Sequence, residues 1–198
     1  MQQPPHPQHP PYPHHGHPPK KKGLGCGVIV AICAAVAVPV LGIMAAIAIP
    51  AFTKYVRRSK TAEARIELAK MFDSVSSYHM ENGRCPGGLQ GDAGSTPPIS
   101  VNCNLGQGGR CIPGDAYPAS AWTENEAWSA LGFEIAGEHY FHYNLRWSQD
   151  SSGACQFTAQ AFGDLDDDGV FSTYERAGAA DVNGVNAAAG LYIDREVE

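Results

Sequence analysis

The densest group of chemically competent side chains lies between Asp164 and Glu175, in the run DLDDDGVFSTYE. Carboxylates recur there at alternate positions, and hard cations such as Ca²⁺ prefer carboxylate and carbonyl oxygens at this spacing. Gly169 permits the sharp turn of a twelve-residue calcium loop, and Phe171 supplies its apolar anchor. The spacing predicts a Ca²⁺ site whose ligands are Asp164, Asp166, Asp168, Val170 through its carbonyl, Ser172 through a water, and Glu175.

The alternative is an acidic, solvated turn between two strands. The preceding segment, Cys155 to Phe162, has the pattern of a strand, so a complete helix–loop–helix hand is not expected. Four carboxylates packed between positions 164 and 168 would repel one another, and a divalent ion would relieve that repulsion.

Cysteines suggest a second kind of chemistry. An even set of four in a small, Gly-rich region is typical of disulfides formed in an oxidising compartment. Three pairings are possible, and we favour Cys103 with Cys111 and Cys85 with Cys155. A zinc site is the alternative, although no CxxC motif occurs in the sequence.

Catalytic motifs give little support for an enzyme. The sequence has no GxSxG, no Walker loop and no HExxH. His139 and His142 would face opposite sides of a strand, so a shared metal is not expected. We expect a protein without enzymatic activity, with a tethered hydrolase as a minor alternative. The acidic region around these residues also argues against a nucleic-acid partner, because such binding normally needs a basic patch.

The charge of the chain is distributed very unevenly along the sequence. Its 198 residues carry a formal net charge of −6, but no acidic residue precedes Glu63. Residues 1–62 therefore carry +7 and residues 63–198 carry −13. The first 19 residues hold eight of the 15 prolines and five of the eight histidines. We expect residues 1–23 to be a disordered His/Pro-rich tail with a Lys cluster; transition-metal binding by its histidines is the alternative.

Residues 24–52 form an apolar run without a charge, and about 20 such residues cross a bilayer as a helix. Pro39, Gly42 and Pro50 interrupt the run, which membrane helices tolerate. A buried helix of a soluble core is the alternative, but no other segment is apolar enough to cover it. We predict a transmembrane helix. Basic residues flank both ends, so the cysteines decide the orientation: a single-pass inner-membrane protein with a cytoplasmic N-terminus and a periplasmic head.

After the span, helix signals continue without a breaker to about Met80, and residues 53–81 are predicted to extend the same helix. The whole helix would have roughly 55 residues and a length of about 80 Å. Asn82-Gly83 supplies its stop signal. The predicted apolar face of the second half consists of Ala62, Ile66, Ala69, Phe72, Val75 and His79.

The remaining residues, 82–198, are predicted to form a disulfide-stapled extracytoplasmic head. Trp122 to Leu131 has the pattern of a short helix, and His139 to Trp147 alternates like a strand. Ala154 to Phe162 and Leu191 to Glu196 are two further expected strands. The expected fold class is α+β, with a long N-terminal spine helix packed on a small antiparallel sheet.

The run GIMAAIAIPAF from Gly42 to Phe52, followed by Tyr55 and by RSKTAEA from Arg58 to Ala64, closely resembles the N-terminal helix of type IV pilins and pseudopilins. The resemblance covers about 40 residues, from Val28 to roughly Ala69. The C-terminal run GLYIDREVE and the Trp/Tyr-rich middle look like pilin heads of the delta-proteobacterial kind. The resemblance implies an α+β head on a spine helix, an inner-membrane intermediate, and assembly into a helical fibre. The assembly spine that it implies is Gly42, Ile43, Ala46, Ile49, Pro50, Phe52 and Tyr55.

The sequence departs from the family at its N-terminal processing site. If Pro50 takes the place of the family's proline, the mature chain would start at Ile29 and Cys33 would replace the family's acidic residue. The residue before Ile29 is Val28, and Gly27 lies one residue out of register. Because a buried carboxylate is kept in a membrane only for a partner, loss of both the acid and the cleavage site is self-consistent. It suggests an uncleaved, membrane-retained relative, although minor pilins vary here.

Two functions follow as expectations. The first is a structural, minor or atypical, pilin-like component of a type IV pilus or type II secretion-like filament system, with a Ca²⁺-stabilised head. Its partners would be other pilin or pseudopilin subunits, reached through the N-terminal helix, the inner membrane, and the assembly platform. The protein could also be located in an extracellular filament. The alternative is a permanently anchored extracytoplasmic binding or sensing module that depends on calcium and reuses the pilin spine.

Overall fold

The computed structural model describes residues 25–106, 108–188 and 190–196. The predicted tail, residues 1–23, lies outside these ranges. The chain divides into two compact units, Met1–Ala48 and Ile49–Glu198. The fold is α+β, as expected. Its elements are α1 (Cys26–Asn82), β1 (Gln90–Asp92), η1 (Cys103–Leu105), α2 (Ala121–Glu124), α3 (Glu126–Leu131), β2 (His142–Gln149), β3 (Cys155–Gly163), β4 (Ser172–Asp181), β5 (Gly184–Ala187) and β6 (Tyr192–Asp194).

Helix α1 is continuous through Pro39 and Pro50 and ends where the sequence predicts, with Gly83 in a left-handed conformation at φ 63°. In the first unit, its residues from Cys26 to Ala48 are all exposed. α1 is long and apolar enough to cross a membrane. This supports the prediction of a membrane-spanning helix.

In the second unit, α1 packs along one face of the sheet with a stripe that matches the predicted one at Phe72, Val75 and His79 and departs from it earlier in the helix. Ile66 is 55 % exposed, and Ala62 is exposed as well. The buried stripe consists of Thr61, Ala64, Leu68, Met71, Phe72, Val75 and His79, so three of the six predicted positions are buried. The larger Leu68 and Met71 side chains offer more apolar area to the sheet than Ala62 and Ala69, which explains why they replace the first half of the predicted stripe.

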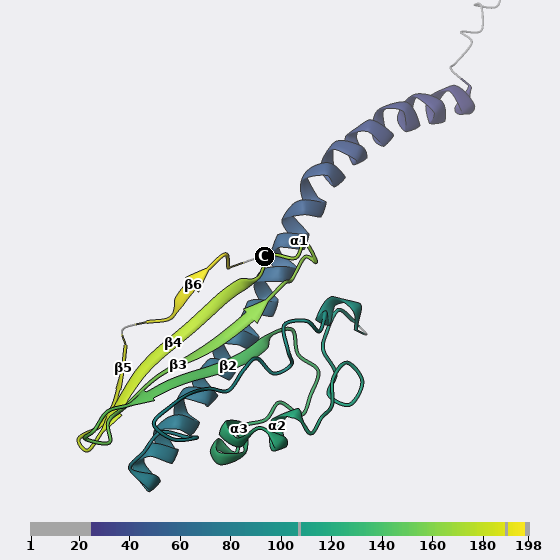
Figure 1. Cartoon of the computed structure of the whole chain (residues 1–198). Coiled ribbons are helices and arrows are strands. Elements are labelled where there is room, and N and C mark those ends of the chain that lie inside the picture. The colour runs from purple at the N-terminus through teal and green to yellow at the C-terminus, as the bar shows by residue number, and fades with distance from the viewer. Residues whose placement is uncertain (1–24, 107, 189, 197–198) are drawn as a thin grey trace, which may run out of the picture. The chain divides into compact units, whose positions relative to one another are not determined.

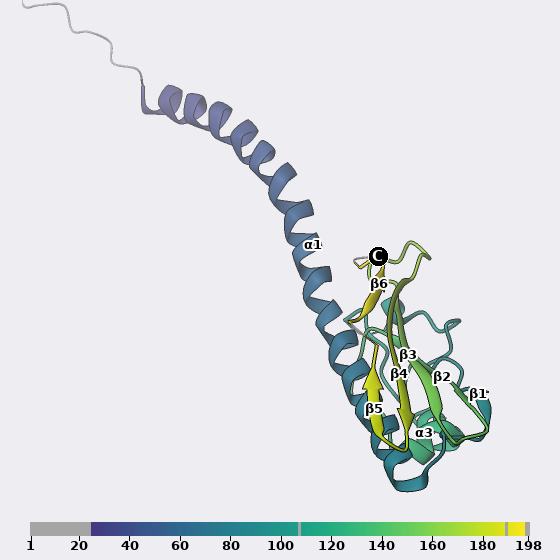
Figure 2. The ribbon, with the colours of Figure 1, turned by 90° about the vertical axis from the view of Figure 1, so that its left-hand side faces the viewer.

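The sheet is antiparallel, with strand order β1-β2-β3-β4-β5 (Figure 1). β6 pairs with the first part of β4, and β5 pairs with its last part. Strands β2, β3 and β6 lie where three strands are predicted, although β2 begins at His142 rather than His139. Figure 2 shows β5 and β6 following one another along the outer edge of β4.

Strand β4 is not predicted from sequence because its small residues lack the alternation of a strand. Those small residues have a packing role. A Cβ atom on Gly178 would lie 2.5 Å from the Phe72 ring and 2.7 Å from the Phe157 ring. The two rings themselves pack with centroids 5.1 Å apart. Glycine at this position therefore allows the aromatic side chain of α1 to approach the sheet closely.

The segment between α1 and β2 carries an aromatic cluster. The helix expected from Trp122 to Leu131 is divided at Asn125, whose side chain accepts hydrogen bonds from the Ala127 and Trp128 amides and so caps α3. Trp122, Trp128 and Phe133 pack with ring centroids 5.4–5.7 Å apart. This cluster, together with the buried faces of α1 and the sheet, forms a single core.

Candidate functional site

The predicted calcium loop is the connection between β3 and β4. Gly163 ends β3 and Ser172 begins β4, so the loop proper has only the eight residues between them. The carboxylates of Asp164, Asp166 and Asp168 converge, with one oxygen of each within 4.8 Å of the others. We call these three residues the carboxylate triad.

Asp164 shapes the loop through hydrogen bonds to the backbone. Its carboxylate accepts the amide hydrogens of Asp167 at 2.7 Å, Asp168 at 3.2 Å and Gly169 at 3.0 Å. Asp167 has a φ of 64°, a conformation that aspartate tolerates better than most residues. The turn is therefore held by its first carboxylate, and the next two alternate carboxylates are brought beside it.

Asp166 links the loop to α1. Its Oδ2 atom lies 2.6 Å from Nη1 of Arg57, in an ion pair whose side chains are 16 % and 30 % exposed respectively. Its other oxygen, Oδ1, is buried and has no hydrogen-bond donor among the residues described. Arg57 of α1 thus neutralises one oxygen of Asp166, while the other oxygen of the same carboxylate keeps an unused acceptor position.

Two of the six predicted ligands, Ser172 and Glu175, have other partners. Ser172 is fully buried and its hydroxyl donates to the Gly163 carbonyl at 2.7 Å, so it is not placed to hold a water for a cation. Glu175 lies within β4 and accepts from Gln160 of β3 at 2.5 Å. Val170 follows the triad, and its amide donates to Asp168 at 2.7 Å, a bond that does not involve the carbonyl predicted as a ligand. The cause is the start of β4 at Ser172, which draws the last part of the predicted loop into the sheet.

Two asparagines that the sequence analysis did not single out brace the loop from outside. Asn102 donates to Asp167 at 2.9 Å, and Asn104 donates to the Asp164 carbonyl at 2.5 Å. They flank Cys103 of a predicted disulfide, and this proximity is the only signal in the sequence that could have identified them. The arrangement offers three carboxylates on a braced turn, a donor set that suits a hard cation such as Ca²⁺.

Both disulfides form in the predicted pairing. Cys85–Cys155 joins the segment after α1 to the first residue of β3. Cys103–Cys111 closes a short loop over a sequence separation of 8 residues. Cys26 and Cys33 of the apolar half of α1 are free and exposed.

The residues assigned to an assembly spine all lie on α1 and are exposed. The bulky ones are Ile43, Ile49, Phe52 and Tyr55, with exposures between 64 % and 72 %. Gly42, Ala46 and Pro50 are exposed between them. Large apolar side chains exposed in this number require a lipid or protein environment, because their contact with water is unfavourable.

A partly buried carboxylate fixes α1 to the head. Glu63 accepts the Tyr140 amide at 2.9 Å and the Tyr143 hydroxyl at 2.9 Å. Burial raises the pKa of the Glu63 carboxyl above its usual value, although these hydrogen bonds oppose the shift. Glu63 was not predicted as a functional residue. Its only sequence signal is that it is a charged residue next to Ala64, in the buried stripe of α1.

The C-terminal segment is also fastened to α1. The Glu196 carboxylate lies 2.9 Å from Arg65 and 3.3 Å from Arg58, and its carbonyl accepts the Tyr174 hydroxyl at 2.5 Å. Arg57, Arg58 and Arg65 are therefore partners of the head as well as basic residues beside the apolar run.

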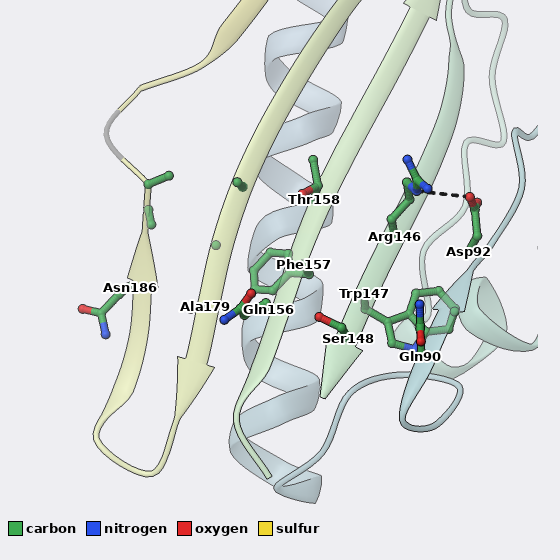
Figure 3. Close-up of a pocket in the computed structure, with 15 residues that line it drawn as sticks. Gln90, Asp92, Arg146, Trp147, Ser148, Gln156, Phe157, Thr158, Ala179 and Asn186 are labelled. Atoms are coloured by element: carbon green, nitrogen blue, oxygen red, sulfur yellow. Dashed lines mark ion pairs between the residues drawn. The ribbon is translucent and has the colours of Figure 1, made fainter. Parts of the chain in front are cut away.

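A groove of about 790 Å³ crosses the sheet between β1 and β5 (Figure 3). Arg146 of β2 and Asp92 of β1 form an ion pair at its side, 3.3 Å apart, and Gln156 and Thr158 of β3 contribute amide and hydroxyl groups. The charge of Arg146 is already paired, and we assign no function to this groove.

Comparison of the chain with family models, with curated proteins and with solved structures finds no match.

Proposed function

We propose that this chain is a pilin-like structural component, minor or atypical, of a type IV pilus or type II secretion-like filament system. The observation that carries the proposal is a division within α1. Its second half buries one stripe against an antiparallel sheet, whereas its apolar first half has every residue from Cys26 to Ala48 exposed. A spine of this kind suits insertion in a membrane and packing against other spines.

The sequence resemblance gives the proposal its specific form. The GIMAAIAIPAF run and Tyr55 occupy the exposed part of α1 in the order found in pilins. The proposed location is the inner membrane, with the N-terminus in the cytoplasm and the head in the periplasm. The two disulfides of the head support this orientation because such bonds persist in oxidising compartments.

A photo-crosslinking experiment in cells tests assembly. A crosslinking residue at Ile43, on the exposed spine, is expected to capture other copies of this chain or other pilin-like subunits. The matched control is Val182 at the turn between β4 and β5, which is 93 % exposed but lies in the head. Recovery of no filament or secretion component from Ile43, together with an unchanged filament phenotype on deletion, would contradict the proposal.

A permanently anchored binding or sensing module is the second candidate, favoured by Cys33 and Val28 at positions where pilins carry an acid and a glycine. Mass spectrometry of the N-terminus of the mature protein discriminates between the two candidates. A chain that begins near Val28 or Ile29 favours assembly, and an intact His/Pro tail favours the anchored module.

We further propose that the carboxylate triad binds Ca²⁺ and that the ion stabilises the head. Asp164, Asp166 and Asp168 would hold it, and the buried, unused Oδ1 of Asp166 supports this assignment. The ion would neutralise like charges on the loop. Glu175 and Ser172 have other partners, so we omit them from the ligand set.

A further inference from the structure

A histidine that neither the filament role nor the carboxylate triad uses lies beside a disulfide. His142, the first residue of β2, is 2 % exposed. Its Nδ1 atom lies 2.9 Å from the Pro97 carbonyl, and its Nε2 atom lies 3.6 Å from Sγ of Cys103.

The hydrogen-bond partners fix the tautomer of this ring. A carbonyl oxygen only accepts, so Nδ1 must carry the proton. Burial lowers the pKa of the His142 imidazole, which keeps the ring neutral and leaves Nε2 with a bare lone pair. The sulfur of a disulfide has no proton to donate. Within the described part of the chain, this buried acceptor therefore has no donor as long as Cys103 is bonded to Cys111.

A pocket leads to the same two side chains. It has a volume of about 170 Å³ and is lined by both Cys103 and His142. Ile99 and Gly169 are exposed at its rim. Cys103 retains 6 % exposure, whereas Cys85 and Cys155 of the other disulfide are fully buried. The volume of the pocket suits a small molecule, and its lining also includes Asn102, Asn104 and Asp164.

We propose that the Cys103–Cys111 disulfide is a site of thiol–disulfide exchange with small thiols that enter this pocket, and that His142 Nε2 favours the reduced form by accepting a hydrogen bond from Cys103. The Cys85–Cys155 disulfide remains a structural bond.

The exchange takes place in two steps. A thiolate attacks Sγ of Cys103; its bond to Cys103 forms as the Cys103–Cys111 bond breaks, and Cys111 leaves as a thiolate that takes a proton from water. A second thiolate attacks the sulfur of the first thiol in the mixed disulfide, and Cys103 leaves as a thiolate that also takes a proton from water. The two small thiols are oxidised to one disulfide, and the protein disulfide gains the two electrons. Cys103 then carries a proton that it donates to His142, so the orphaned lone pair gains a partner.

Reduction gives the buried Nε2 atom of His142 a hydrogen-bond donor. We therefore expect the Cys103–Cys111 bond to be reduced in preference to Cys85–Cys155. Cys103 also lies in sequence between Asn102 and Asn104, which brace the carboxylate loop. Opening it releases one end of that brace, so exchange would loosen the loop between β3 and β4.

The test uses the full chain in detergent micelles, equilibrated in buffers of reduced and oxidised dithiothreitol, quenched with acid, alkylated and mapped by peptide mass spectrometry. We expect Cys103–Cys111 to open at a lower ratio of reduced to oxidised reagent than Cys85–Cys155. His142→Phe keeps a ring but has no lone pair, and we expect its Cys103–Cys111 bond to need about tenfold more reducing conditions.

The matched control is His79→Phe. His79 is also buried, and its Nε2 lies 3.1 Å from the Gly153 carbonyl near the other disulfide. We expect this variant to leave the opening of Cys103–Cys111 unchanged. If the two disulfides of the wild-type chain open at the same reagent ratio, the proposal is overturned, whether or not His142→Phe folds. If His142→Phe folds and its Cys103–Cys111 bond opens at the wild-type ratio, the role of His142 is overturned.

Discussion

Arg57 on α1 lies 2.6 Å from Asp166 in the loop between β3 and β4, and this ion pair spans 109 residues of sequence. It places a helix guanidinium on one of the three carboxylates proposed to bind Ca²⁺. A bound cation and Arg57 therefore compete for the negative charge of Asp166. The proposed metal site is thus coupled to the attachment of the spine helix to the head.

The first prediction concerns this competition. Arg57→Gln leaves Asp166 without its ionic partner, so we expect the head to lose about 1–2 kcal/mol of stability in chelator. We also expect Ca²⁺ to bind several-fold more tightly, because no guanidinium competes for the carboxylate. Unfolding followed by the fluorescence of the three tryptophans, all of which lie in the head, and calorimetric titration measure the two effects.

Arg58→Gln is the control for this substitution. Arg58 is 64 % exposed and contacts Glu196 at 3.3 Å, so its loss should change stability by less than about 1 kcal/mol. An unchanged Ca²⁺ affinity in Arg57→Gln would show that the guanidinium and the cation do not share Asp166.

The second prediction concerns removal of the metal. Chelation should lower the melting temperature of the wild-type head, because three close carboxylates then repel one another. Asp166→Asn should abolish the response to Ca²⁺. Asp167→Asn is the matched control: Asp167 lies outside the triad, and asparagine tolerates its left-handed φ of 64°. A melting temperature that ignores chelator in both the wild type and Asp166→Asn would rule out a structural ion.

Features of the fold that depend on local interactions could be predicted from the sequence, and those that depend on distant contacts could not. Alternation of residues predicted β2 and β3, and the Asn82-Gly83 stop predicted the end of α1, because these signals are local. Strand β4 carries small and polar residues, and its place in the sheet is decided by its pairing with β3, which no local pattern reveals. For the same reason the predicted loop extended to Glu175, although the strand begins at Ser172.

The proposed site shows the same division. Asp164, Asp166 and Asp168 converge because their spacing is a property of one turn. Arg57, which pairs with this turn, and Asn102, which braces it, come from distant segments and could not be predicted from composition or periodicity.

The third prediction concerns the partly buried carboxylate of Glu63. Its pKa is raised in the folded state, so between the unfolded value, about 4.5, and the higher folded value the folded chain holds more protons. This group therefore makes stability fall as the pH rises through that window. Glu63→Gln removes the titration and should flatten this part of the pH dependence. Glu63→Leu leaves the Tyr143 hydroxyl and the Tyr140 amide unpaired and should cost about 1–3 kcal/mol.

Glu67→Gln, one turn further along α1, is the control for Glu63. Its carboxylate pairs with Lys70 at 2.7 Å and is the smallest of the causes that raise the pKa of Glu63, so Glu67→Gln should leave most of the slope in place. A slope that survives in Glu63→Gln and disappears in Glu67→Gln would reverse the assignment.

The fourth prediction concerns His139, whose Nδ1 lies 2.8 Å from the Phe141 carbonyl and whose Nε2 lies 2.8 Å from the Tyr117 hydroxyl. Burial lowers the pKa of its imidazole from 6.5 to about 4. Between these two values the unfolded chain holds more protons, so stability should rise with pH and be fully present above about 6.5. The contribution is on the order of 3 kcal/mol and opposite in sign to that of Glu63, so it is best measured in the Glu63→Gln background. NMR titration of the His139 ring should show a neutral imidazole at pH 5, and a midpoint near 6.5 would contradict its burial in this network.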